Sequence, residues 1–177
     1  MRPPHSSEKA RGRSLLRLLR LSDWLFLSLA ALASVGFFIC VSTQVFYRYV
    51  LEAPLPWSEE LARYLFVWTA MLAAAVSVGR SDQFNIPMFA DILGDGPRRW
   101  LEVAIAILGI VFACVMVWYG WKMAYRFMGA VSPVLPVPQG SVYLCIPVAG
   151  VYMFVHLAYR LVGLVSGRIA PKSGTPW

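Results

Sequence analysis

Residues 103–121 read VAIAILGIVFACVMVWYGW, nineteen residues without a charged side chain between Glu102 and Lys122. A helix needs roughly 20 apolar residues to cross about 30 Å of hydrocarbon, so this run predicts a transmembrane helix. Other long apolar runs lie on both sides of it, at Trp24–Tyr47, Tyr64–Gly79 and Phe127–Tyr159. The chain is 59% hydrophobic, well above the share in soluble domains. We therefore expect an all-α integral membrane protein with four transmembrane helices.

Charges, prolines and capping residues set the expected boundaries. The transmembrane helices are expected at about 22–47, 58–79, 100–126 and 141–165, inside one membrane domain of residues 22–165. Ser58 is a favourable N-cap for the second helix, and Pro147 predicts a kink in the last. Residues 1–21 are expected to form a basic cytoplasmic tail and a surface helix, and residues 166–177 a cytoplasmic tail. Within 1–21, residues 1–13 are too poor in apolar residues to form a core and are expected to be a mobile tail, whereas Ser14–Leu21 fits a surface helix or a simple extension of the first span.

The distribution of positive charge predicts the orientation in the membrane. Twelve Lys and Arg residues flank the side that carries both termini, and four flank the other side. The positive-inside rule therefore places both termini in the cytoplasm. The net charge of +7 does not indicate nucleic-acid binding, because the basic residues flank apolar runs. Ala31-Leu32-Ala33 resembles a signal-peptide cleavage site, but the apolar run continues to Val45, which favours a retained helix.

The connection after the second helix contains a short amphipathic segment. Pro87 is placed to open a helix, which we expect at about 87–93 in the plane of the membrane interface. Its apolar side chains share one face at helical spacing: Phe84, Met88, Phe89, Ile92 and Leu93. Asn85 and Asp91 are the polar members of the segment. It is a candidate strut at the inner membrane surface.

The chain carries no pattern typical of an enzyme, a cofactor site or a metal site. The sequence contains two histidines and three isolated cysteines, and neither a P-loop nor a nucleophile elbow. We therefore expect no catalytic residue, and the cysteines are expected to act as small buried hydrophobes. His156 is the only histidine within an apolar run; a hydrogen-bonding role between helices is favoured over a proton relay.

Polar side chains gather at the start of the second helix, in Trp57-Ser58-Glu59-Glu60-Leu61-Ala62-Arg63-Tyr64-Leu65-Phe66-Val67-Trp68. Glu59 and Arg63 are spaced i to i+4, which favours a pair on one helix face, and Glu60 points elsewhere. Three interpretations are open for this cluster: helix capping, a polar interface with another subunit, and direct ligand binding. The scarcity of polar anchors elsewhere favours the interface, with Trp57 and Tyr64 packing beside Glu59, Glu60 and Arg63.

The segment from Trp57 to Trp68 resembles the signature of the small membrane subunit of tripartite ATP-independent periplasmic (TRAP) transporters, the DctQ-like family. Ser132-Pro133, followed by Pro138, Tyr143 and Pro147, is similar to the pattern that leads into the last helix of that family. The resemblance covers roughly residues 20–165. One departure lies after the second helix, where many members carry His-Ile and then an acid, whereas this chain has Asn85-Ile86 and, at a looser spacing, Asp91.

The resemblance implies a multi-pass protein of the bacterial inner membrane that pairs with a large DctM-like membrane subunit and a periplasmic substrate-binding protein. In such systems the large subunit carries the substrate and sodium sites, and the small one braces its scaffold during uptake of an organic acid. Membrane lipids are the other expected partners. The sequence leaves two alternatives: a self-contained transporter that works as a homo-oligomer, and a membrane sensor or assembly factor without transport.

Overall fold

The computed structural model describes residues 6–80, 95–132 and 134–166. Helices account for almost all of these residues, and the single isolated bridge in them joins Val131 to Pro138. In the described parts, four helices are long and apolar enough to cross a membrane: Leu19–Tyr49, Pro56–Gly79, Trp100–Phe127 and Gly140–Val165. The prediction of an all-α protein with four transmembrane helices is confirmed. The orientation of the termini stays a prediction.

The first helix is longer than expected. Helix α1 extends over Ser6–Tyr49 without a break, 44 residues or about 66 Å at the usual rise. The bilayer including its headgroups is about 40–45 Å thick, so α1 exceeds it. The structure thus differs, over residues 6–13, from the expectation that residues 1–13 form a mobile tail; residues 1–5 lie outside the described residues. Of the two interpretations of Ser14–Leu21, the continuous extension of the first span is the one observed.

Helix α2 occupies Pro56–Gly79 and begins two residues before the expected position. Pro56 suits the first helical turn because its missing N–H would have no partner there. The N-cap is Leu55, so the prediction that Ser58 caps the helix is wrong. The Ser58 hydroxyl instead donates back to the Leu55 carbonyl oxygen at 2.8 Å.

Helix α4 covers Asp95–Phe127, and a short helix α5, Gly140–Tyr143, precedes α6, Cys145–Val165. The helix predicted for residues 141–165 is therefore divided at Leu144. Pro147 explains this position, because a proline has no N–H to donate to the carbonyl group four residues earlier. Regular bonding resumes at once, with the Val148 N–H donating to the Leu144 carbonyl oxygen at 3.2 Å.

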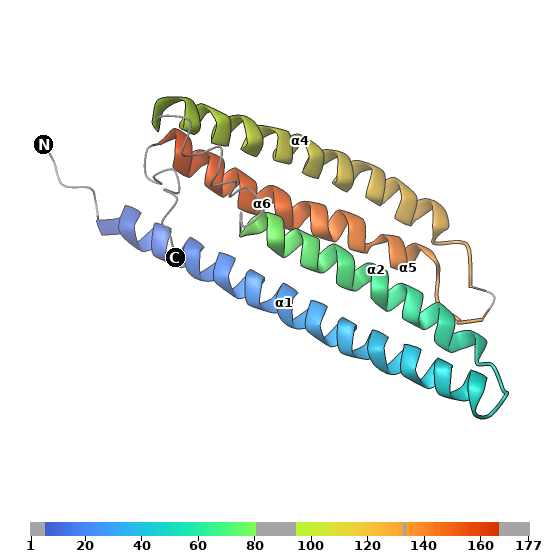
Figure 1. Cartoon of the computed structure of the whole chain (residues 1–177). Helices are drawn as coiled ribbons and strands as arrows, with labels where there is room; N and C mark the ends of the chain where they lie inside the picture. The colour runs from blue at the N-terminus through green and yellow to red at the C-terminus, as the bar shows by residue number, and fades with distance from the viewer. Residues whose placement is uncertain (1–5, 81–94, 133, 167–177) are drawn as a thin grey trace, which may run out of the picture.

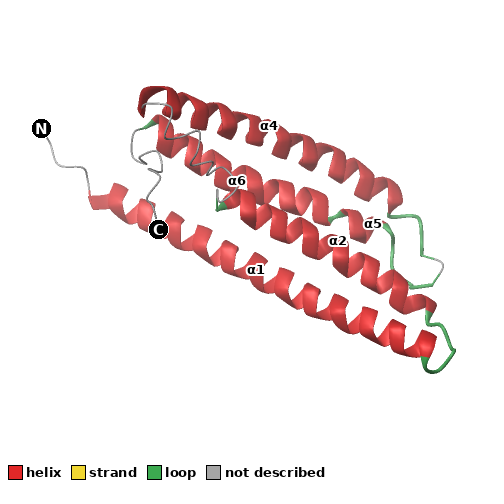
Figure 2. Ribbon diagram, viewed as in Figure 1, coloured by secondary structure: helices red, strands yellow, loops and turns green. Residues whose placement is uncertain are grey.

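The helices lie side by side in the order α1, α2, α6, α4 (Figures 1 and 2). The main contacts follow this order: α2 packs against α1 and α6, and α6 packs against α4. The start of α1 and the end of α6 lie at one end of the row, which we call the terminal end. The connections 50–55 and 128–139 lie at the other, which we call the loop end. Helices α1 and α4 are thus the outer members of the row.

Small residues bring the helices of the row close together. The buried core joins Ala75 and Val76 of α2, Ala113 of α4, and a group on α6 that includes Ala149 and Met153. Small side chains are typical of membrane helix interfaces because they let backbones approach. Many large apolar side chains are exposed along α1 and α4. In a membrane these surfaces meet lipid or a partner helix.

Candidate functional site

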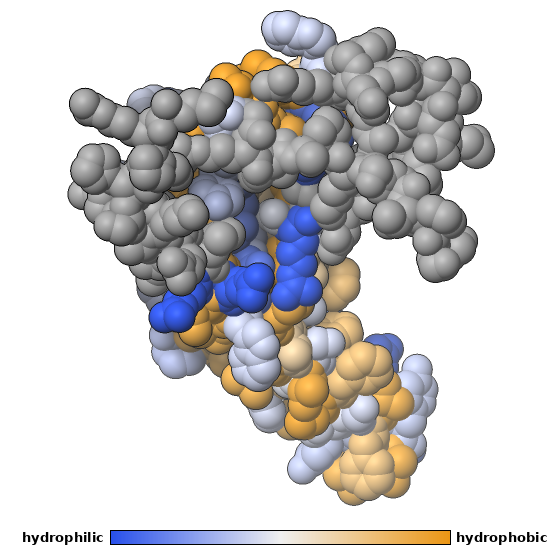
Figure 3. Space-filling view, turned by 90° about the vertical axis from the view of Figure 1, so that its left-hand side faces the viewer, coloured by the Kyte–Doolittle hydropathy of each residue, from blue (hydrophilic) through white to orange (hydrophobic). Residues whose placement is uncertain are grey.

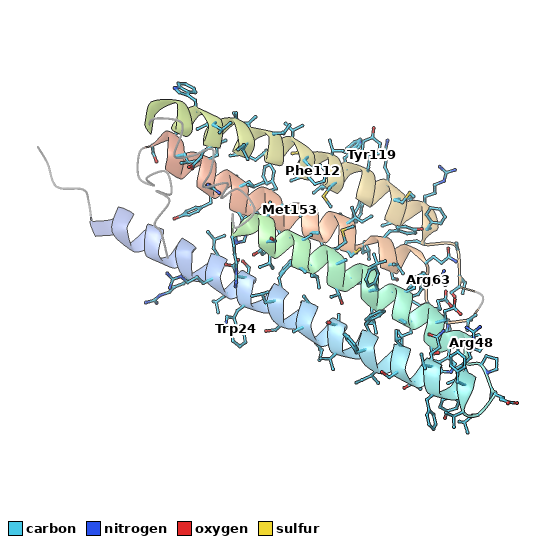
Figure 4. All side chains as sticks on the ribbon, in the orientation of Figure 1. Trp24, Arg48, Arg63, Phe112, Tyr119 and Met153 are labelled. Atoms are coloured by element: carbon cyan, nitrogen blue, oxygen red, sulfur yellow. The ribbon has the colours of Figure 1, made fainter. Side chains whose placement is uncertain are left out.

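The sequence motif at the start of α2 separates into outward-facing and inward-facing residues. Trp57, Glu59 and Arg63 are exposed, whereas Glu60 is buried and Tyr64 is half-buried. Among the described residues, Glu59 and Arg63 do not form the ion pair that their spacing suggests. Figure 4 labels Arg63 near the loop end of α2.

Glu60 makes the contacts that the sequence did not reveal. The Tyr64 hydroxyl, one turn along α2, donates to Glu60 Oε1 at 2.5 Å. The Ser132 hydroxyl, 72 positions further along the chain, donates to the same oxygen. Glu60 therefore joins the start of α2 to the connection between α4 and α5.

Ser132 in turn organises the connection that contains it. Its side-chain oxygen accepts hydrogen bonds from the backbone N–H groups of Val134 and Leu135, both at 3.3 Å. The Gln139 N–H donates to the Ala130 carbonyl oxygen at 2.9 Å, which closes the connection into a narrow loop. We call residues 130–139 the loop-end tongue. Three of its described side chains are exposed valines: Val131, Val134 and Val137.

A second polar cluster joins helices at the terminal end. Asp23 of α1 lies 2.9 Å from His156 Nε2 of α6, measured from its Oδ1, and 3.9 Å from Arg80 Nε at the end of α2, measured from its Oδ2. The Tyr152 hydroxyl also donates to Asp23 Oδ1. Sequence reasoning placed His156 between helices but missed Asp23, because 133 positions separate them. We call Asp23, Arg80, Tyr152 and His156 the terminal cluster.

An ion pair connects α4 to α6 at the same end. Arg160 Nη2 donates to Glu102 Oε2 at 3.2 Å, and both side chains are largely buried. The small cavity beside them is lined by Glu102, Ile105, Ala106, Leu157 and Arg160. The polar contacts therefore lie near the two ends of the row.

The middle of the row is apolar. Within the described ranges, no Asp, Glu, Lys, Arg or His lies between Asp23 and Arg48 of α1, or between Glu102 and Lys122 of α4. The stretch of α2 between Arg63 and Arg80 is equally free of charge. No group of His, Cys, Asp and Glu that could hold a metal ion occurs in the searched, described part of the chain. The geometry thus offers helix-joining contacts at the ends, and the described α1, α2 and α4 carry no charged side chain between those ends.

The expected interfacial helix at 87–93 lies outside the described residues. The same holds for all of its candidate side chains: Phe84, Asn85, Pro87, Met88, Phe89, Asp91 and Ile92. The two motifs quoted from the sequence, by contrast, meet in the structure. The first supplies Glu60 and Tyr64, and the second supplies Ser132.

Comparison with known proteins identifies the family. Residues 37–167 match the family described as tripartite ATP-independent periplasmic transporters, DctQ component. The chain belongs to the DctQ family. Its resemblance to TRAP small membrane subunits is therefore confirmed, and as a TRAP permease component it is an inner-membrane protein.

Several curated proteins share this family with the DctQ chain. It is 29% identical over 122 residues to the sialic acid TRAP transporter small permease protein SiaQ of Vibrio cholerae, covering 69% of this chain and 70% of the relative. It is 23% identical over 141 residues to a putative TRAP transporter small permease protein of Haemophilus influenzae, covering 80% and 85%. It is also 28% identical over 137 residues to the isethionate TRAP transporter permease protein DctMQ of Oleidesulfovibrio alaskensis, covering 71% of this chain but 21% of that longer relative.

Proposed function

We propose that this DctQ chain braces the scaffold of a large DctM-like membrane subunit. In this proposal the two form a TRAP transporter for sodium-coupled uptake of an organic acid, which a periplasmic binding protein delivers. The observation that carries the proposal is the distribution of polar contacts. They fasten the helices to one another near both ends of the row, while the middle holds no charge that could bind a solute or an ion.

The contacts at the ends make the row a stiff unit. At the loop end, Glu60 fastens the tongue to α2 through Ser132. At the terminal end, Asp23 contacts both α2 and α6, and the Glu102–Arg160 pair fastens α4 to α6. Truncating one member of a buried charge pair typically costs 3–5 kcal/mol, so such contacts resist sliding of one helix along another. A stiff layer suits a subunit that holds a moving partner in place.

The exposed face of α2 is the part of the row that we assign to the partner. Its charged members are Glu59 and Arg63, and Trp57 is exposed on the same turn as Glu59. Further along α2, the exposed side chains at helical spacing are Phe66, Ala70, Ala73 and Ala74. Small residues allow close approach of another transmembrane helix, and interhelical polar contacts add orientation. Glu60 faces inward and acts by fixing the tongue beside this face.

The longer DctMQ relative supports a membrane-embedded partner, because this chain aligns to 21% of its length. The relatives are named for sialic acid, isethionate and C4-dicarboxylate, which are all organic anions. We therefore propose an organic acid as the substrate of the assembled transporter. Its binding site would lie in the large subunit, because no charge occupies mid-membrane in the described part of this chain.

The test compares Arg63→Ala with Lys122→Ala in cells that express the whole transporter. Both residues are exposed cations near the loop end, but Arg63 lies on the assigned face and Lys122 on α4. We expect Arg63→Ala to lower recovery of the large subunit with the tagged chain, and to lower uptake in proportion. Lys122→Ala should leave both unchanged, and both variants should insert into the membrane.

Equal recovery of the large subunit from both variants would remove α2 from the interface. A wild-type chain that purifies alone or as a homodimer would refute the scaffold proposal. That result would favour the self-contained transporter or the sensor.

A further inference from the structure

The outer side of α4 carries one continuous stripe of exposed side chains, which we call the α4 stripe. It lies opposite the small side chains that pack α4 against α6, such as Ala106 and Ala113. No described helix covers it, because α4 is the last member of the row. From the terminal end to the loop end, the α4 stripe includes Trp100, Leu108, Val111, Val115, Trp118 and Lys122.

Two tryptophan rings mark the ends of the apolar part of the α4 stripe. Trp100 is 76% exposed and Trp118 is 63% exposed. The 18 residues from one to the other span about 27 Å at the usual helical rise, close to the roughly 30 Å of hydrocarbon in a bilayer. Tryptophan is enriched at both interfaces of a membrane, where its ring sits at the level of the headgroups. The rings are therefore spaced to lie at the two interfaces of one bilayer.

Positive charge lies just beyond the rings. Lys122 Nζ is 5.2 Å from the centroid of the Trp118 ring, and Lys122 is one turn closer to the loop end. At the other end, Arg98 and Arg99 directly precede Trp100 in the sequence. Lipid phosphates lie at these levels, and long basic side chains reach out of the hydrocarbon toward them. Apolar side chains between two rings, with cations outside the rings, complement a phospholipid bilayer.

We propose that the α4 stripe faces phospholipid, and that it keeps this contact when the transporter assembles. The large subunit then meets the row elsewhere, in agreement with the α2 face. The assembled transporter in this statement rests on the proposed function, but the lipid contact does not. Lys122 then contacts lipid phosphate and no subunit, in agreement with the unchanged recovery expected for Lys122→Ala.

Side-chain size distinguishes the α4 stripe from the α2 face. Membrane helices dock closely through small residues, which let their backbones approach. The α2 face offers three exposed alanines, whereas the α4 stripe has one small member, Ala104. The small residues of α4 are used against α6 instead: a Cβ atom at Gly120 would lie 2.8 Å from Ile146 Cγ2. The outer side of α4 is therefore poorly suited to close docking of another helix.

The α2 face also lacks the paired rings. Trp57 is exposed at its loop end, but residues 76–79, the last turn of α2, contain no aromatic side chain. On α4, Ile107 and Phe112 widen the exposed apolar surface on either side of the stripe. Figure 3, which looks at the terminal end, shows hydrophobic residues exposed at the top, the height at which α4 lies in Figure 1, and strongly hydrophilic ones mainly lower down. Of the two surfaces, the α4 stripe is the one whose chemistry matches a bilayer.

Oxygen accessibility of a nitroxide label tests the proposal. The label is attached to Val115→Cys on the α4 stripe or to Ala70→Cys on the α2 face, in a chain whose three native cysteines are replaced by alanine. Both positions lie near the middle of their membrane spans, so oxygen in the surrounding hydrocarbon is comparable. A label that faces lipid collides with oxygen often, and a label at a protein contact does so rarely. Each labelled chain is measured in lipid nanodiscs, alone and with the large subunit.

We expect both labels to be accessible in the isolated chain, and the Val115 label to keep its accessibility on assembly while the Ala70 label loses it. Loss of accessibility at Val115 on assembly would overturn the proposal, whatever the label at Ala70 shows. A Val115 label that is already inaccessible in the isolated chain would overturn it too, because lipid would not reach the stripe. Accessibility kept at both positions would support the lipid contact of α4 and refute the α2 interface, so the two proposals fail separately.

A second measurement applies if the cysteine-free chain does not fold. A photo-crosslinking p-benzoylphenylalanine is placed at position 115 or 70 of the chain with its native cysteines, in membranes that contain the whole transporter. An adduct with the large subunit from position 70 and none from position 115 supports the proposal. An adduct with the large subunit from position 115 overturns it.

Discussion

Gly140→Ala should be among the most disruptive single-methyl additions in the described part of the chain. Gly140 opens α5 and packs against the end of α4. A Cβ atom there would lie 2.5 Å from the Ala124 carbonyl oxygen, 2.8 Å from the Met128 nitrogen and 2.9 Å from Met128 Cα. These neighbours are all backbone atoms, so no side chain can rotate away.

The expected loss of stability depends on how far α5 and the end of α4 must move apart to make room for the added methyl group. Non-bonded carbon atoms prefer separations of about 3.5–4.0 Å, so α5 and the end of α4 must move apart by about 1 Å. Overpacking of a tight contact typically costs 1–3 kcal/mol, and a clash with backbone belongs at the upper end. We expect Gly140→Ala to lower the free energy of unfolding by about 3 kcal/mol.

Gly129→Ala is the matched control, because it lies at the other end of the same connection and a Cβ there meets nothing within 4 Å. The purified chain is unfolded in mixed micelles by titration with sodium dodecyl sulfate. The unfolding free energy of each variant is then compared with that of wild type. We expect Gly129→Ala to change the unfolding free energy by less than about 1 kcal/mol. Equal unfolding midpoints for the two variants would refute the argument that a Cβ atom at Gly140 clashes with the backbone at the end of α4.

Other predictions concern the end contacts and the topology. Ser132→Ala should raise amide hydrogen exchange of Val134 and Leu135 about tenfold, because each N–H loses its acceptor, whereas Ser132→Thr should keep the protection. Glu102→Ala should destabilise the chain in the same unfolding titration, by up to about 3 kcal/mol, because it removes the carboxylate that Arg160 Nη2 contacts at 3.2 Å. Glu59→Ala, at an exposed residue, should leave the unfolding midpoint unchanged. A fluorescent protein fused after Trp177 should be bright, and alkaline phosphatase at the same point inactive, because the positive charges predict a cytoplasmic terminus. The opposite pattern would reverse the orientation.

The number of membrane helices could be predicted because hydrophobic length is a local property of the chain. Each transmembrane helix corresponds to an apolar run in the sequence. The motif from Trp57 to Trp68 indicated the family. The starts of helices were harder to place, as Ser6 of α1 and Leu55 at the cap of α2 show. Helix termini depend on backbone partners, and a residue with good capping propensity does not have to be used as a cap.

The partners of the polar side chains could not be predicted, because they depend on which helices become neighbours. Glu60 meets Ser132 across 72 positions, and Tyr152 meets Asp23 across 129. The local spacing of Glu59 and Arg63 suggested a pair that the fold does not form. Spacing along one helix identifies a shared face, but burial between helices decides which carboxylate finds donors. In the described part of the chain, the carboxylates so placed are Asp23, Glu60 and Glu102.

The order α1, α2, α6, α4 also determines what the chain cannot enclose. A pore needs helices arranged in a closed ring, so that the first and last members touch. Here the described helices α1 and α4 stand at opposite edges, with α2 and α6 between them. The described row therefore has two surfaces and no lumen. To close these described helices into a ring, another polypeptide would have to complete the wall.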